Sequence, residues 1–227
     1  LTDTLNMDVN RQNAKAYCML KYYKTSINRY EALKAMGDRS FTTLYYLGVS
    51  QYADNWPYGA RDNLLEAHKK NPMDVNVLYY LAKACARSSW KEEGIAYMNK
   101  AFDMVVPTDS MMIRLYDGLL ECYKFHTKAD PYEKIEVMKE AYSYTKKYTL
   151  FYQIAEIYDY QKDYVNAVHY YEKYMALVPK NKQAALDSEG NPLPNVDTMY
   201  QKARRRVEKI KVEDFFRNGA HDDYFEW

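Results

Sequence analysis

Residues Phe41–Asp74 read FTTLYYLGVSQYADNWPYGARDNLLEAHKKNPMD. Apolar residues recur in this stretch at spacings of three and four, which is the periodicity of amphipathic helices, and Pro72 ends the pattern. Gly48 and Ala60 are small enough to let two helices approach closely, while Leu64 fills the space that remains. The stretch therefore predicts one tightly packed helical hairpin.

The same order of small and large residues returns about every 34 residues, with one slip of about two residues before Met138. The copies that begin at Val75 and Tyr148 match the first stretch best, through Leu78, Leu81, Ala82, Gly94, Met98 and Ala101, and through Phe151, Ile154, Ala155, Tyr158, Ala167 and Tyr171. The copies that begin at Met7 and Ile113 are degenerate. We therefore predict five hairpins within residues 1–181, at about 7–40, 41–74, 75–108, 113–147 and 148–181.

These residues resemble the pattern of the tetratricopeptide-repeat (TPR) family, in which Leu-Gly, Ala, a bulky apolar residue, Ala and Pro follow one another at fixed spacings. The resemblance implies an all-α, right-handed TPR-type α-solenoid of about five hairpins, each stacked on its neighbours. It also implies a non-catalytic scaffold that binds a protein or peptide. The richness in tyrosine, 26 against 7 phenylalanines, resembles TPR proteins of bacterial cell envelopes, so we expect a location in the envelope or periplasm.

Composition limits the other classes of function. The formal net charge of the 227-residue chain is only +1, whereas nucleic-acid-binding domains usually carry a strong basic excess. No window reaches the ~20 apolar residues of a membrane-spanning helix. We therefore expect neither a nucleic-acid partner nor a membrane span. The chain begins at Leu1 rather than methionine, which is compatible with removal of a signal peptide or of a preceding segment.

The residues that most often carry catalysis form no recognised arrangement. Cys122 and His126 are four apart on a predicted helix, but no second pair with metal-ligand spacing stands near them. The seven glycines form no phosphate-binding loop. Cys18, Cys85 and Cys122 are predicted to be buried thiols in first helices. We therefore expect no enzymatic activity, no metal and no cofactor.

The resemblance also implies where a partner binds. In TPR proteins the concave surface is lined by fixed positions on the first helix of each hairpin. Carried onto this sequence residue by residue, those positions give the candidate groove residues Arg11, Lys15, Tyr45, Tyr52, Tyr79, Lys83, Arg87, Arg114, Asp117, Glu121, Tyr152 and Glu156. The earlier positions are basic with tyrosine between the charges, and the later ones are largely acidic. We therefore predict a polarised groove for an extended or helical peptide, since tyrosine and arginine often dominate binding energy.

The sequence also predicts where the second helix begins in two of the hairpins. Ser89 with Glu92, and Asp130 with Glu133 behind Pro131, have the spacing of capping boxes. The first pair is expected to open the second helix of the third copy, and the second pair that of the fourth.

Beyond the repeats the composition changes. Residues 182–195 contain the turn-rich run DSEGNPLP and are predicted to be a linker. Residues 196–211 are predicted to form a helix that caps the last hairpin, and its apolar stripe is Met199, Ala203, Val207 and Ile210. Arg204, Arg205 and Arg206 are expected on its solvated side.

The segment 212–227, VEDFFRNGAHDDYFEW, combines acidic with aromatic side chains. Two interpretations stay open. In one, this tail docks on a basic, tyrosine-lined surface of its own or a neighbouring molecule, which would make the protein a structural, self-associating solenoid. In the other, Phe215 and Phe216 pack under the capping helix and the rest of the tail makes no fixed contact.

Overall fold

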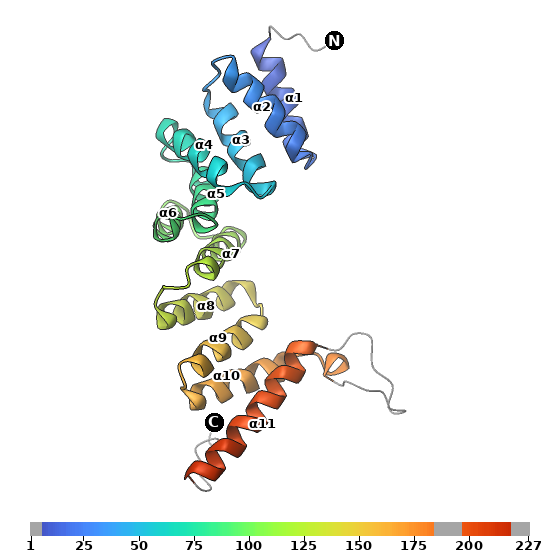
Figure 1. The fold of residues 1–227 in the computed structure, drawn as a ribbon, viewed down its shortest axis with the longest axis vertical. Helices are drawn as coiled ribbons and strands as arrows, with labels where there is room; N and C mark the ends of the chain where they lie inside the picture. The colour runs from blue at the N-terminus through green and yellow to red at the C-terminus, as the bar shows by residue number, and fades with distance from the viewer. Residues whose placement is uncertain (1–5, 184–196, 219–227) are drawn as a thin grey trace. The chain divides into compact units, whose positions relative to one another are not determined.

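The computed structural model describes residues 6–183 and 197–218, and the regular structure in these residues is entirely helical. The helices are α1 (Met7–Met19), α2 (Tyr23–Ala35), α3 (Phe41–Ala53), α4 (Pro57–Lys70), α5 (Val75–Ala86), α6 (Lys91–Asp103), α7 (Asp109–Phe125), α8 (Pro131–Thr145), α9 (Thr149–Tyr160), α10 (Tyr164–Leu177) and α11 (Thr198–Asn218), with a short 3-10 helix at Lys180–Lys182 (Figure 1). The chain forms two compact units, Leu1–Ala129 and Asp130–Trp227, which we call unit 1 and unit 2.

Helix α1 pairs with α2, α3 with α4, α5 with α6 and α9 with α10, and the described regular structure confirms the all-α class. Helices α7 and α8 belong to different units, so the predicted fourth hairpin, 113–147, stays a prediction. The two helices of a hairpin pack on each other, as α3 does on α4 and α9 on α10. One boundary differs from the sequence-based expectation, because α7 begins at Asp109 rather than near Ile113. The side chain of Thr108 accepts a hydrogen bond from the backbone N–H of Met111 (3.4 Å), so this residue caps the helix earlier than the repeat pattern predicted.

The two predicted capping boxes have different outcomes. The Asp130 side chain accepts hydrogen bonds from the N–H groups of Tyr132 (2.7 Å) and Glu133 (3.0 Å), so it caps α8 as predicted. The prediction for Ser89 is wrong. Helix α6 begins at Lys91, which leaves Ser89 one residue too early to reach the first-turn N–H groups, and its hydroxyl instead lies 3.2 Å from that of Tyr58.

Small residues bring the paired helices together in unit 1. A Cβ atom added at Gly48 would lie 3.1 Å from the backbone oxygen of Ala60, and one added at Gly94 would lie 2.8 Å from that of Ala82. Leu64, on the second helix of its hairpin, is completely buried in the space between. The predicted interlocking of small and large residues is therefore confirmed in this hairpin.

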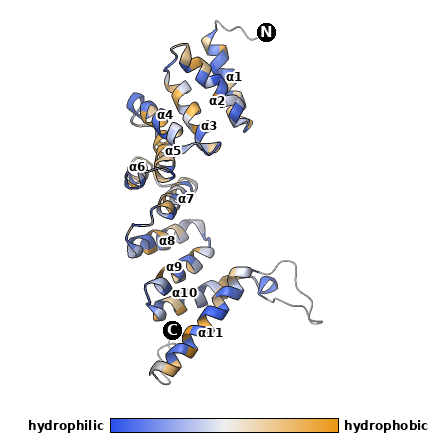
Figure 2. Cartoon of the chain, viewed as in Figure 1, coloured by the Kyte–Doolittle hydropathy of each residue, from blue (hydrophilic) through white to orange (hydrophobic). Residues whose placement is uncertain are grey.

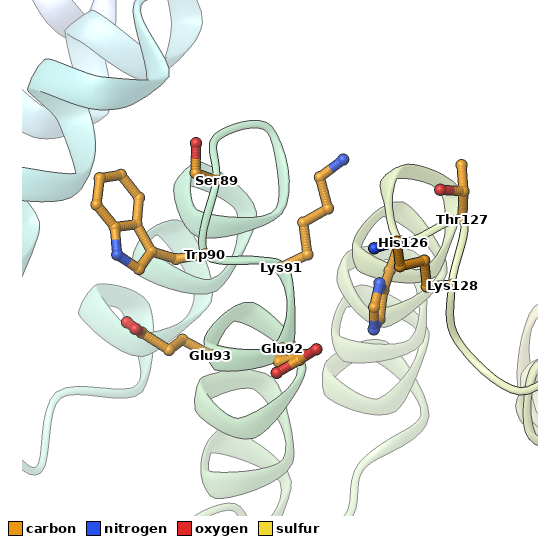
Figure 3. A pocket seen from close by; sticks show the side chains of 8 residues that line it. All are labelled: Ser89, Trp90, Lys91, Glu92, Glu93, His126, Thr127 and Lys128. Carbon is orange, nitrogen blue, oxygen red and sulfur yellow. The ribbon is translucent and has the colours of Figure 1, made fainter.

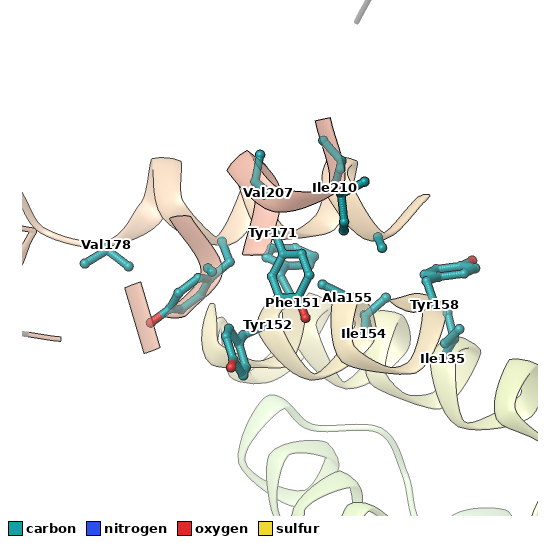
Figure 4. Close-up of a cluster of buried hydrophobic side chains, with 14 residues drawn as sticks. Ile135, Phe151, Tyr152, Ile154, Ala155, Tyr158, Tyr171, Val178, Val207 and Ile210 are labelled. Atoms are coloured by element: carbon teal, nitrogen blue, oxygen red, sulfur yellow. The ribbon is translucent and has the colours of Figure 1, made fainter. Parts of the chain in front are cut away.

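Unit 2 has one core shared by α8, α9, α10 and α11. Figure 4 shows the side chains of Phe151 and Ile154 on α9 gathered with Tyr171 on α10 and with Val207 and Ile210 on α11. The helix α11 packs on α10 and so covers the last hairpin. This placement gives the hairpin the apolar cover that an end repeat of a solenoid lacks.

Helix α11 differs from the predicted capping helix in length and partly in its stripe. It continues through Asn218, beyond the predicted end at residue 211, and carries both polar and apolar residues along its length (Figure 2). Ala203 is buried, but Met199 is exposed, and Tyr200 packs against the core instead. Phe215 and Phe216 are 57% and 81% exposed, so the interpretation in which they pack under the helix is wrong.

Several predictions fall partly outside the described residues. Most of the predicted linker 182–195 and the end of the tail, residues 219–227, lie there. Within the described ranges, no helix combines the length and hydrophobicity needed to cross a membrane. Cys18, Cys85 and Cys122 are all buried free thiols, as predicted.

Candidate binding surface

The first helices of unit 1 form one surface. Helix α1 contacts α3, α3 contacts α5, and α5 contacts α7. We call the side chains that these four helices present together the first-helix surface. Its predicted members are Arg11, Lys15, Tyr45, Tyr52, Tyr79, Lys83, Arg87, Arg114, Asp117 and Glu121. Tyr152 and Glu156 lie on α9 in unit 2, so a groove that runs from one unit to the other remains a prediction.

The centre of the first-helix surface is an internal ion-pair network. The carboxylate of Glu121 on α7 accepts hydrogen bonds from the Tyr52 hydroxyl (2.6 Å) and from Nε of Arg87 (2.6 Å). Its other oxygen lies 2.9 Å from Nζ of Lys83. We call these four residues the Glu121 cluster. Glu121 was predicted in the acidic half of the groove, but the structure places it among the bases of the third repeat, because α7 packs directly on α5.

Burial and charge act against each other in the Glu121 cluster. Burial opposes ionisation of Glu121, but the hydrogen bonds from Tyr52 and Lys83 outweigh it and hold the pKa of the carboxyl below its usual value. The pKa of Lys83 is raised, because the bond to Glu121 outweighs the effect of burial on the ammonium group. Both residues are therefore charged at neutral pH, and the Glu121 side chain is only 17% exposed. Such a pair fixes the positions of its members.

Cations lie over the faces of the tyrosine rings on the same surface. The guanidinium carbon of Arg87 is 4.5 Å from the ring centroid of Tyr52, and that of Arg114 is 4.4 Å from the ring centroid of Tyr79. Nζ of Lys83 is 4.9 Å from the Tyr79 centroid. Tyr52 and Tyr79 are only 7% and 9% exposed, so they support the cations more than they offer open contact area.

Gly118 makes room for this arrangement, and it was not identified from the sequence. A Cβ atom at this position would lie 2.7 Å from the Tyr79 ring and would also overlap the end of the Met98 side chain. The signal was present, because a glycine inside a helix is unfavourable and usually has a packing reason. Gly118 therefore lets α7 approach Tyr79 closely.

A chain of aromatic contacts links α3 to α5. The rings of Tyr45 and Tyr80 meet edge to face with 6.2 Å between centroids, and those of Tyr52 and Tyr80 do so at 6.1 Å. Tyr45 also meets Tyr46 at 4.9 Å. Tyr45 is half-buried and keeps part of its ring accessible. Tyr80, which was not among the predicted groove residues, joins the others because it adjoins Tyr79 in the sequence and turns toward α3.

Arg11 has a structural role at the start of unit 1. Its Nε donates to Asp38 (2.7 Å), and it also pairs with Asp8 on the same helix. Burial opposes ionisation of Asp38, but the bonds from Arg11, Thr43 and Ser40 lower the pKa of its carboxyl well below the usual range. Arg11 therefore ties the first hairpin to the start of α3 and is not a free cation.

Lys15 and Arg114 lie against neutral groups in the contacts that the structure describes. Nζ of Lys15 lies 5.2 Å from the ring centroid of Tyr46, and both residues are half-buried. Arg114 donates to the side-chain oxygen of Asn76 (2.8 Å), which is a neutral acceptor. The first-helix surface therefore presents positive groups that are held in place by rings and an amide.

The predicted residues of unit 2 have different environments. Tyr152 is buried against the edges of Tyr171 and Tyr174, and burial together with the nearby Glu156 carboxylate raises its pKa to about 12. Glu156 itself is exposed. On the same helix, Asp159 accepts two hydrogen bonds of 2.6 Å from Arg206 on α11. The expectation that Arg206 is a solvated cap residue is therefore wrong, because α11 turns it toward α9.

One hollow of about 380 Å³ lies between the turn after α5 and the turn after α7 (Figure 3). Its lining mixes Lys91 and Lys128 with Glu92 and Glu93, so the charges of the four side chains balance. His126 lines the hollow, whereas Cys122 is buried and its thiol faces the Ala82 carbonyl oxygen at 3.7 Å. The two residues therefore do not converge on a metal position, and the described residues hold no group of three or more metal ligands.

No family model and no curated protein matches the sequence. Solved structures do match. MamA MSR-1 aligns with a TM-score of 0.61 at 14% identity, over 75% of this chain and 95% of that one. YrrB, described as a TPR protein with an unusual peptide-binding site, aligns with a TM-score of 0.61 at 12% identity, over 78% and 89%. MamA AMB-1 aligns with a TM-score of 0.59 at 15% identity, over 78% and 100%. At these identities the likeness concerns the fold alone.

Proposed function

We propose that this chain, whose fold is that of TPR proteins, is a non-catalytic scaffold that binds a peptide or protein partner on the first-helix surface of unit 1. The observation that carries the proposal is the set of cations stacked on tyrosine rings there. Large side chains that combine an apolar face with directional donors are typical of the residues that dominate binding energy.

The internal contacts prepare this surface for binding. The Glu121 cluster holds Arg87 against the ring of Tyr52, and Gly118 keeps Tyr79 under Arg114. Side chains that are already ordered lose less conformational entropy when a partner binds. A surface of this kind therefore favours tight binding without rearrangement.

The predicted groove residues divide into two roles under this proposal. Lys15, Tyr45, Arg87 and Arg114 contact the partner, because each keeps part of its side chain accessible. The supporting residues are Arg11, Tyr52, Tyr79, Lys83 and Glu121, which hold the surface together. Asp117, Tyr152 and Glu156 remain predictions as partner contacts.

The test is affinity capture from an extract of the source cell, with the complete chain as bait. We expect the double variant Lys15→Glu, Arg114→Glu to lose a specific partner by roughly tenfold or more, since reversed charges in a contact oppose binding. The matched control is Lys24→Glu, Lys69→Glu, which reverses two exposed lysines on the second helices α2 and α4. Identical captures by the two variants would contradict the proposal.

The choice of variants follows from the structure. Tyr79→Ala would open space beneath Arg114, and Arg87→Ala would leave Glu121 with one fewer donor. Both changes would weaken folding as well as binding. Lys15 and Arg114 make no hydrogen bond or ion pair with the Glu121 cluster, so their loss reports on the partner.

A further inference from the structure

We propose that the first-helix surface of unit 1 binds the C-terminal segment of a second copy of this chain, residues 219–227, GAHDDYFEW. This inference rests on the proposed function and names one partner for the same surface. The segment lies outside the described residues, so the argument is built from the surface, from the end of α11 and from the chemistry of the segment.

The surface already binds one carboxylate in the required way. Glu121 is held by the hydroxyl of Tyr52, by the guanidinium of Arg87 and by the ammonium of Lys83, all within 2.9 Å. These contacts show that the surface can hold a carboxylate next to an aromatic ring and a cation. Cations outnumber acids at this place, because Lys15, Lys83, Arg87 and Arg114 share the surface with two carboxylates, those of Asp117 and Glu121.

The segment carries the complementary groups. Asp222, Asp223 and Glu226 supply three carboxylates, and the segment has no lysine or arginine. Aromatic side chains stand beside these acids, at Tyr224, Phe225 and Trp227. Acids can pair with the stacked cations while the aromatic rings extend the tyrosine contacts, and such large rings supply most of the energy of small interfaces.

The end of α11 leads away from the core of its own unit. Val212, Phe215 and Phe216 are all more than half exposed on its last turns. The rings of Phe215 and Phe216 contact each other at 5.8 Å and not the core that Ile210 joins. Exposed aromatic residues of this size favour association, and a second molecule would cover them. Because the donor and the acceptor are different surfaces, the contact can repeat from molecule to molecule.

The experiment compares full-length chains by analytical ultracentrifugation. We expect the average mass of the wild type to rise between roughly 1 and 500 µM, as for a small interface with a dissociation constant on the order of 100 µM. Asp222→Lys, Asp223→Lys should stay monomeric over the same range, because its tail repels the basic surface. Lys15→Glu, Arg114→Glu should also stay monomeric, while the Lys24→Glu, Lys69→Glu control should behave as the wild type.

Mixing the two monomeric variants gives the decisive result. The basic tail of one then meets the acidic surface of the other, so an equimolar mixture should associate although neither variant does alone. A wild type that stays monomeric, or association that survives the tail variant, would overturn the proposal, and so would a mixture that stays monomeric. If the capture experiment still yields a partner in those cases, the scaffold function stands and only this occupant fails.

Discussion

Unit 1 and unit 2 each hold a first-helix acid in short hydrogen bonds, but the donors differ. In unit 1, Glu121 accepts from Tyr52 on α3 and from Arg87 on α5, both at 2.6 Å. In unit 2, Asp159 accepts two bonds from one residue, Arg206 on the terminal helix α11. The first acid joins neighbouring repeats, whereas the second joins a repeat to the helix that caps it.

The difference shows how neighbouring helices balance a charge at a repeated position of a first helix. At these two positions a neighbouring helix supplies the opposite charge, so the first-helix acid does not face solvent alone. Asp159 is matched by one guanidinium, so its charge is balanced within unit 2. Glu121 meets both Lys83 and Arg87, so unit 1 keeps a positive excess at its centre. Under the proposed function, an acidic partner is therefore expected on unit 1 and not on the α9–α11 contact of unit 2.

Removal of the Glu121 carboxylate is expected to have the largest effect on the free energy of unfolding. Glu121→Ala leaves Lys83, Arg87 and Tyr52 without their common acceptor, and we expect the free energy of unfolding to fall by about 3 kcal/mol. Urea denaturation followed by circular dichroism measures this change. Glu121→Gln, which keeps an acceptor oxygen, should lose less. Equal stability of Glu121→Ala and wild type would show that the cluster does not hold the repeats together.

A smaller loss of stability is expected in unit 2, when the pair between Arg206 and Asp159 is removed. Arg206→Ala removes both bonds to Asp159 at a partly exposed position, and we expect a loss of about 1.5 kcal/mol. Arg204→Ala is the matched control, since Arg204 pairs with Glu208 at an exposed site on the same helix. If both variants lose the same amount, the bidentate pair contributes nothing particular to the attachment of α11.

Acid should weaken unit 1 through Asp38 and Glu121. Folding lowers the pKa of both carboxyls, so their stabilisation is complete above the unfolded-state values near ~4 and is lost as the pH falls through the lower folded-state values. We expect the urea midpoint to stay level from about pH 7 to 5 and to fall below about pH 4. In Asp38→Asn, Glu121→Gln the midpoint at neutral pH should be lower, and the fall in acid should be shallower by roughly 1 kcal/mol. Parallel curves would mean that other carboxyls cause the acid sensitivity.

The smallest effect is expected at the exposed end of α11. Phe216→Ser removes a ring that is 81% exposed and should change the free energy of unfolding by less than about 0.5 kcal/mol. Ile210→Ala on the same helix should cost about 2 kcal/mol, because Ile210 belongs to the core of unit 2. Thermal denaturation of the two variants measures the contrast. A large loss in Phe216→Ser would mean that the ring already has a partner.

The sequence predicted the packing within a hairpin well, because that packing depends on residues close in the chain. Gly48, Ala60 and Leu64 lie within one repeat, and the pattern that they form was sufficient. The site was predicted less well. The first helices were the right elements, but Gly118 and Tyr80 were missed. Both residues contact side chains of another repeat. The spacing of residues within one repeat does not predict such contacts.

The sequence by itself determined the all-helical class, the paired helices and the buried thiols, since the short-range alternation of small, large and polar residues is enough to specify them. Only the tertiary structure decided which charges are internal. Tyr52 and Glu121 are 69 residues apart, and Arg87 and Glu121 are 34 apart, yet they share hydrogen bonds. Whether a charge at a repeated position binds a partner or a neighbouring helix depends on how the repeats stack, and stacking is a property of the folded chain.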